Sequence, residues 1–345
     1  MAARLDPASG VHSRLVDLRE LRADDLAPLL DEEISAWRAM LHWDFGKSAD
    51  LVRRFVDMRA LNGFALMAGR ETAGYAYYVL EDHKGLIGDL FVRNAYRSAA
   101  NERSLLESVL GALVETSPIS RIESQLMMTR SPDWRSMPLS FCLSGFERNF
   151  MMLEMDHAVL GPPRRASAAN RFYIDKWSEH HQEPAAQLIA GAYQGHVDSL
   201  INDQYRSVAG ARRFLYNIVQ YPGCGAFFKP ASLAAFERLT GRIAGMCLAS
   251  LVMPDCGHIT QICVAPWARG VGLGYESLRQ SLTLLETAGC RRTSLTVTGS
   301  NRDAIKLYGT VALSLCAGST RTSGKVSSLI LICLARKITS TSGMS

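Results

Sequence analysis

A run of glycines follows an arginine in the stretch VAPWARGVGLGYESL, residues 264–278. Arg269, Gly270, Gly272 and Gly274 stand between an apolar run and a stretch of helical periodicity. Because glycine has no Cβ, peptide N–H groups at this turn are open to a bulky group, and a helix N-terminus adds positive potential. The pattern favours binding of an anion, and a phosphate fits it best. The alternative is that the glycines only close a tight turn.

This turn differs from two common phosphate-binding motifs. Tyr275 stands where a P-loop would place its lysine, and also where G-x-G-x-x-G would place its third glycine. What remains is R-x-x-G-x-G, preceded by the V-x-P of Val264 and Pro266. A nucleotide-phosphate binder is therefore disfavoured, and it would predict competition by ATP.

The elements around the turn follow from periodicity. Leu278, Leu282 and Leu285 have the i, i+4, i+7 spacing of a buried helix face. Residues 293–299 alternate like a strand, and Asn301 is a good N-cap for a further helix. Upstream, short strands are expected over 241–264 and helices over 180–220.

The same order of elements occurs in the first half of the sequence. LIGDLFVRNAYRSAANERSLLESVL aligns with HITQICVAPWARGVGLGYESLRQSL, so that Val92 faces Val264 and Arg97 faces Arg269 at an offset of 172. An internal duplication is indicated. Helices, antiparallel-type strands, a turn, a helix, a strand and a helix predict a mixed α/β layer fold in each half. The expected domains are 1–160 and 171–345, joined by a linker at 161–170 that contains two prolines.

Composition excludes several classes of protein. The 345 residues are 48% hydrophobic and 21% charged, as in a globular chain with room for two domains. The net charge of +5 and pI near 8.8 come from scattered basic residues, so nucleic-acid binding is not expected. Neither a membrane helix nor a secretory signal is expected. Eight cysteines without a CxxC pair fit a reducing cytoplasm, and no metal is expected.

Two motifs together resemble a known family. R-x-x-G-x-G at 269–274 is similar to the acyl-CoA-binding signature of the GCN5-related N-acetyltransferases (GNAT), and NRDAIKLY at 301–308 is similar to their N-x-x-A-x-x-L-Y. The resemblance covers 170–335 well and 15–160 more weakly, so it implies two tandem GNAT-like acyl-CoA N-acyltransferase domains. It implies acetyl-CoA as co-substrate, held by Ile262, Cys263, Val264, Arg269, Gly270, Val271, Gly272, Leu273, Gly274, Tyr275 and Asn301.

The resemblance also implies catalytic roles for an amine attacking a bound thioester. His258 lies where many members carry a glutamate base, and Asp255 is a fallback base or an orienter of His258. Tyr308 is the candidate acid for the leaving thiolate. The alternatives are an ordinary hydrogen-bonded histidine at a strand start and a tyrosine that belongs to the core.

The acceptor end falls on residues 192–205, because the first two helices line the acceptor pocket in this family. Polar side chains there would hold a cationic amine, on a small molecule or a peptide. The alternative is a solvated helix-loop-helix. The candidates are His196, Asp198, Asn202, Asp203 and Tyr205.

The first half lacks most of these residues. Ser98, Ala100 and Glu102 face the three glycines, and Ser136 faces the candidate acid, although Arg97 is kept. Side chains would obstruct a phosphate, and a carboxylate would repel it by about 1 kcal/mol at about 4 Å in water. We therefore expect a degenerate copy without cofactor.

One departure from the family concerns the residues after L-Y. A Gly-Phe pair usually follows, whereas this sequence has Ala312-Leu313, and the first half carries Gly145-Phe146. The last strands of the second half are expected to be irregular, with a closing strand at 327–337.

Two functions remain open from the sequence. The first is an acetyl-CoA-dependent N-acetyltransferase that is active in the second half. The alternative is a non-catalytic acyl-CoA-binding or protein-interaction module that kept the cleft. Oligomeric state stays open, because two fused copies could form a monomer with pseudo-dimeric halves.

Overall fold

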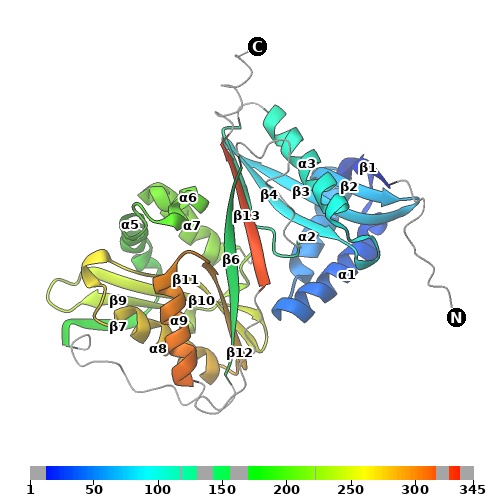
Figure 1. Cartoon of the computed structure of the whole chain (residues 1–345). Helices are drawn as coiled ribbons and strands as arrows, with labels where there is room; N and C mark the ends of the chain where they lie inside the picture. Colours follow the sequence, from blue (N-terminus) through cyan, green and yellow to red (C-terminus); the bar gives the residue numbers. More distant parts are fainter. Residues whose placement is uncertain are drawn as a thin grey trace. The chain divides into compact units, whose positions relative to one another are not determined.

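The computed structural model describes residues 13–116, 119–129, 143–155, 170–221, 223–315 and 326–334 (Figure 1). The expected linker lies outside the described residues except for Asn170, and so does Ser136. The described residues fall into two compact units. One comprises those within Met1–Trp37, Phe45–Gly145 and Leu329–Ser345, and the other those within Arg38–Asp44 and Phe146–Ser328.

Helices and strands alternate along the chain much as their periodicity predicts. The elements up to β6 are β1 (Ser13–Asp17), α1 (Ala23–Leu41), α2 (Gly46–Asp57), β2 (Asn62–Ala68), β3 (Glu71–Glu81), β4 (Lys84–Val92), α3 (Ala99–Glu115), β5 (Arg121–Ser124) and β6 (Leu143–Glu154). The later elements are β7 (Phe172–Lys176), α5 (Gln182–Ala192), α6 (Val197–Ile201), α7 (Val208–Gln220), β8 (Ala226–Phe227), β9 (Leu233–Glu237), β10 (Ile243–Met253), β11 (Cys256–Val264), α8 (Leu273–Thr287), β12 (Arg292–Thr298), α9 (Arg302–Leu315) and β13 (Val326–Leu334).

In the first unit the strands follow the order β1-β2-β3-β4-β5-β13. The β4–β5 pair is parallel and the other pairs are antiparallel. Helix α3 buries the face that its periodicity predicts, with Leu106, Leu110 and Leu113 no more than 1% exposed. These leucines pack on residues of β2 to β4 and form the core of the unit.

In the second unit the order is β6-β12-β11-β10-β9-β7, with β8 paired to β10. Both faces of β10 are covered (Figure 1). Ala244 and Met246 pack in the cluster with α5 and α7, whereas Cys247 and Ala249 pack in the cluster with α8. Because alternate residues of a strand face opposite sides, this sheet is a layer between helices. The predicted mixed α/β class is confirmed.

Each sheet contains one strand from the other half of the sequence. β13, expected to close the second half, pairs antiparallel with β5 in the first unit. β6 pairs antiparallel with β12 in the second unit, with Arg148 opposite Thr298. The expected division into 1–160 and 171–345 stays a proposal. The compact units differ from it by this exchange and by Arg38–Asp44, which belongs to the second unit.

A break in strand pairing opens the second sheet beside the glycine turn. The β10–β11 register shifts between Leu248 and Ala249, so Thr260 is skipped. The parallel β11–β12 pairing ends at Ile259 opposite Leu295, while β11 continues to Val264. A bulge of this kind bends its strand and ends pairing, which leaves space between the diverging strands.

Candidate active site

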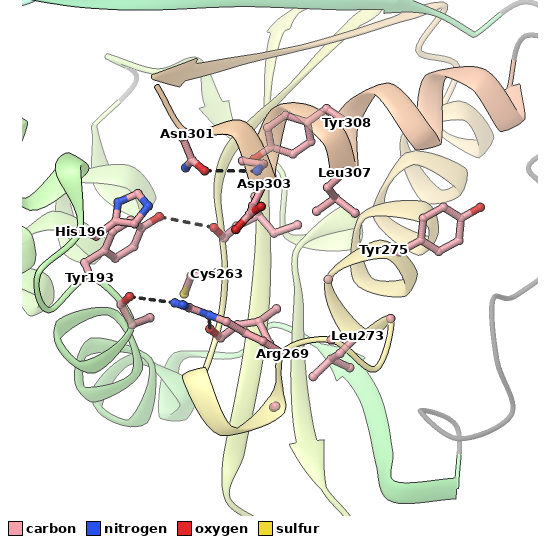
Figure 2. Close-up of a pocket in the computed structure, with 18 residues that line it drawn as sticks. Tyr193, His196, Cys263, Arg269, Leu273, Tyr275, Asn301, Asp303, Leu307 and Tyr308 are labelled. Carbon is pink, nitrogen blue, oxygen red and sulfur yellow. Dashed lines mark hydrogen bonds between the residues drawn. The ribbon is translucent and has the colours of Figure 1, made fainter. Parts of the chain in front are cut away.

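A cavity of about 540 Å³ lies in the second unit, where β11 ends and α8 begins (Figure 2). Figure 2 shows Tyr193 and His196 on one side and Leu307 and Tyr308 on the other. The lining residues are Ala192, Tyr193, His196, Ile262, Cys263, Val264, Ala268, Arg269, Gly270, Gly272, Leu273, Gly274, Tyr275, Asn301, Asp303, Ala304, Leu307 and Tyr308. They include every expected cofactor-binding residue except Val271.

The glycine turn gives this cavity a wall of bare backbone. Gly270 and Gly272 have φ of +78° and +87°, a conformation that other residues adopt only with strain. Gly272 is the N-cap of α8, and no side chain of the described residues caps this helix. A Cβ on Gly274 would lie 3.3 Å from Cγ2 of Val264, so the wall is already close-packed. The uncapped N-terminus fits a bound phosphate.

The Arg269 side chain holds the glycine turn in place through two hydrogen bonds. Its Nη2 donates to the carbonyl oxygen of Ala192 at 2.9 Å, and its Nε donates to that of Val264 at 3.3 Å (Figure 2). The side chain therefore ties the turn to the last residues of α5 and β11. These two hydrogen bonds hold the glycine turn in place, and the guanidinium also adds a positive charge beside it.

The second motif positions a tyrosine on the opposite wall. Asn301 Oδ1 accepts a hydrogen bond from the backbone N–H of Ala304 at 3.2 Å, which caps α9 as the sequence predicts. Tyr308 then lies two turns into the helix and lines the cavity. Burial raises the pKa of Tyr308 well above its ordinary value, with Asp198 adding to the shift. The phenol therefore stays protonated at neutral pH and can donate a hydrogen bond.

A buried hydrogen-bonded chain connects α5 with β11. Gln261 Nε2 donates to the hydroxyl of Tyr193 at 2.9 Å, and the hydroxyl of Tyr205 donates to Gln261 Oε1 at 3.1 Å. The Tyr193 hydroxyl also donates to the carbonyl oxygen of Ile262 at 3.5 Å. Sequence reasoning missed Tyr193 and Gln261. Gln261 is a polar residue inside the apolar run of β11, and this departure from the pattern could have indicated a buried hydrogen bond.

His258 lies away from the cavity. It is 6% exposed, its Nδ1 is 2.9 Å from Ser294 Oγ, and its ring contacts Trp43 and Phe150. Burial lowers the pKa of His258 to about 3. The ring is therefore neutral at pH 7 and takes up a proton only with difficulty. Asp255 lies before β11, at the end remote from the glycine turn, with its Oδ2 3.4 Å from Arg292 Nη1.

Only one of the expected acceptor residues lines the cavity. His196 does so, whereas Asp198 lies behind it with its Oδ2 3.5 Å from His196 Nδ1. Asn202 Oδ1 accepts from the backbone N–H of residue 204 at 3.0 Å, Asp203 begins a short 3-10 helix, and Tyr205 bonds Gln261. The polar stretch thus mostly shapes the loop.

The cavity is also lined by the Cys263 thiol and the Asp303 carboxylate. Burial raises the pKa of the Cys263 thiol to about 12, so it is not a thiolate at neutral pH.

Among the described residues, no group of three or more metal-binding side chains comes together. In the same part of the chain, every helix is too short or too polar to cross a membrane.

Comparisons with known proteins agree with this geometry. Residues 197–310 match the model of the acetyltransferase (GNAT) family. A GCN5-related N-acetyltransferase from Sphaerobacter thermophilus is similar in structure, with a TM-score of 0.60 and 15% identity over 94% of this chain and 95% of that one. A tandem GNAT protein from the clavulanic acid biosynthesis pathway has a TM-score of 0.56 and 16% identity, over 94% and 99%. A search of curated protein sequences gives no match.

The family match covers the glycine turn, β12 and the start of α9, which are the elements that build the cavity. The structural matches extend over both halves. The resemblance read from the two motifs is confirmed. Residues 197–310 are therefore similar to the acetyltransferase (GNAT) family, and the chain as a whole has the fold of tandem GNAT proteins.

Proposed function

We propose that the second half is an acyl-CoA-dependent N-acyltransferase that moves an acetyl group from acetyl-CoA to a primary amine. One observation carries the proposal. The uncapped N-terminus of α8, with Gly270 and Gly272 in left-handed conformation, faces a cavity at the point where β11 and β12 stop pairing. The family typically uses acyl-CoA.

The residues present fit this co-substrate. Backbone amides of 269–274 would hold the pyrophosphate, because a helix N-terminus stabilises an anion and no side chain competes there. The pantetheine arm would pair with Ile262–Val264, where β12 leaves the edge of β11 free. When bound, acetyl-CoA supplies an activated acyl group, and a backbone N–H of this strand would stabilise negative charge on its carbonyl oxygen.

Transfer requires an amine nitrogen to attack the carbonyl carbon. The C–N bond forms, the C–S bond breaks, and the electron pair leaves with sulfur. The ammonium loses one proton to solvent before attack, and the nitrogen loses a second as the amide forms and keeps one N–H. The thiolate takes up a proton, since a thiol has a pKa of about 8.5. Tyr308 donates a hydrogen bond to the departing sulfur, a task that suits a phenol with a raised pKa.

The proton on the amine nitrogen is not removed by His258. The His258 ring is buried between Trp43 and Phe150, and the lowered pKa of His258 makes it a weak base. We assign it a structural part in holding β11 to β12 through Ser294. The amine proton then leaves to solvent, and His196 faces the acceptor side. Asp255 has no part in this scheme.

The test is a titration of acetyl-CoA by calorimetry, followed by thiol release with a panel of amino acids, polyamines, amino sugars and peptides. We expect one site per chain and thiol release with at least one amine. Binding without thiol release would favour the acyl-CoA-binding module, and two sites would show that the first half binds too. Absence of binding would overturn the proposal.

A further inference from the structure

Arg148 brings a positive charge from the first half of the sequence into the second unit. It lies on β6 opposite Thr298 of β12, and both belong to this unit. Its side chain is 17% exposed, and its buried Nε has no hydrogen-bond partner among the residues that the structure describes. Burying a guanidinium costs free energy unless the charge is paired and hydrogen-bonded.

The guanidinium holds an acidic side chain at the start of α6. Arg148 Nη1 donates to Thr298 Oγ1 at 2.9 Å and lies 3.5 Å from Asp198 Oδ1. The Thr298 hydroxyl in turn donates to the same Asp198 oxygen. Thr298 is 2% exposed, so this hydroxyl bridges the two charges inside the protein.

Asp198 sets the orientation of a ring in the cavity wall. Its backbone N–H donates to His196 Nδ1 at 3.1 Å, and its Oδ2 lies 3.5 Å from the same nitrogen. Because Nδ1 accepts, the neutral ring carries its proton on Nε2. His196 thus offers the cavity a hydrogen-bond donor and not a base.

The charges of the pair also reach the tyrosines of the site. Asp198 raises the pKa of both Tyr205 and Tyr308, and Arg148 lowers it, although burial dominates at each. Removing Arg148 would leave the Asp198 carboxylate without its nearest cation. The carboxylate would then pull away toward water or draw the His196 ring toward it.

We propose that Arg148 is a positioning residue for the acceptor end of the cavity, acting through Thr298 and Asp198 to hold His196 with its Nε2–H available to the acceptor. This rests on the proposed function. It follows that the second half depends on a strand contributed by the first half, whose own glycine turn is lost. Contiguous excision of the second half would remove Arg148 together with β6.

The same two strands provide a matched control. At the opposite end of the β6–β12 pair, Glu154 faces Arg292, with Oε1 2.9 Å from Nε. Glu154→Gln removes a cross-strand ion pair that is remote from the cavity. Arg148→Gln removes the ion pair with Asp198 of α6 and the cross-strand hydrogen bond to Thr298, and Arg148→Lys keeps the charge.

The first experiment uses the amine with the highest turnover in the panel, on the full chain. Arg148→Gln should raise the KM for that amine by about tenfold or more, while the Kd for acetyl-CoA stays unchanged. Arg148→Lys should recover part of the loss, and Glu154→Gln should leave the KM unchanged. An equal effect of Glu154→Gln would reduce Arg148 to a fold-stabilising residue and overturn the proposal.

A second measurement does not depend on turnover. Nitrogen NMR of the histidine side chains, with His196 assigned through His196→Gln, should show the Nε2–H tautomer in the parent chain and its loss in Arg148→Gln. If Arg148→Gln does not fold, Thr298→Val removes the bridging hydroxyl at similar volume and should act alike. An unchanged His196 signal in the folded variant would overturn the proposal, whether or not an acceptor is found.

Discussion

The two arginine-led turns, 97–102 and 269–274, occupy the same place in their units and satisfy their polar groups differently. In the first, Ser98 Oγ caps α3 by accepting from the backbone N–H of Asn101 at 3.1 Å. Glu102 is 2% exposed, with its Oε1 3.8 Å from Arg97 Nε. The first turn therefore carries its own cap and its own anion.

The second turn has neither. Gly272 offers no cap, and Arg269 bonds backbone carbonyls rather than a carboxylate. Glu276 lies in the first turn of α8 but is paired with Arg279, so the backbone amides at the start of this helix remain open to an anion. The comparison shows that Ser98 and Glu102 neutralise, within the first turn, the kind of positive potential that the second turn leaves open.

A second difference lies at the bulge that both units share. The β3–β4 register shifts between Tyr77 and Tyr78, as β10–β11 does between Leu248 and Ala249. Asp89 therefore corresponds to Gln261. In the second unit this position holds a neutral amide between tyrosines, whereas in the first it holds a carboxyl that hydrogen-bonds Glu33.

The largest effect is expected at the phosphate cradle. Gly272→Glu places a carboxylate and a strained φ at the N-terminus of α8, and should weaken acetyl-CoA binding by about 1,000-fold, or 4 kcal/mol. Calorimetry measures it. Ala100→Glu, at the matching position of the first turn, should leave the affinity unchanged. A comparable loss of affinity in Ala100→Glu would show that the first turn also takes part in acetyl-CoA binding.

The buried carboxyls should make stability depend on pH. Burial raises the pKa of Asp89 to about 6, and burial together with Asp89 raises that of Glu33. Because the folded state then binds more protons than the unfolded chain, the contribution of this pair to stability is fully present below about pH 4 and is lost as pH rises through about 6. The free energy of unfolding should fall by about 3 kcal/mol over that range.

Denaturant titrations at several pH values test this expectation. Asp89→Asn should flatten the profile, since the amide that replaces the carboxyl resembles Gln261 of the second unit. Asp24→Asn changes an exposed carboxyl and serves as the control. A profile that stays steep in Asp89→Asn would show that other groups carry the pH dependence.

The tyrosine of the second motif should affect turnover and not binding. Tyr308→Phe removes the hydrogen bond to the leaving sulfur and should lower kcat by about 30-fold, or 2 kcal/mol, with the Kd for acetyl-CoA unchanged. Thiol release measures the rate. Tyr216→Phe, on the exposed side of α7, is the matched control. Full activity in Tyr308→Phe would show that Tyr308 is a core residue without a role in acetyl transfer.

The smallest effect is expected at the cap of the first turn. Ser98→Ala should lower the free energy of unfolding by about 1 kcal/mol, because an N-cap acceptor is lost. Acetyl-CoA affinity and stoichiometry should not change. A second binding site in this variant would mean that the cap alone closes the first turn to phosphate.

The sequence by itself determined the local chemistry of this protein. The glycine turn, the Asn301 cap and the buried leucines of α8 depend on neighbours a few residues apart, and the structure has each where its spacing predicts. The offset of 172 residues likewise indicated two similar halves. Backbone conformation, capping and helix periodicity are short-range properties, so they can be read along the chain.

Only the tertiary structure decided which distant strands meet. β13 pairs with β5, and β6 pairs with β12, which brings Arg148 beside Asp198 across 50 residues of sequence. The burial of His258 between Trp43 and Phe150 is likewise invisible to spacing. Strand pairing is set by which edges and apolar faces are left to fill, and a pKa by what packs around the group. Neither is encoded at a fixed distance along the chain.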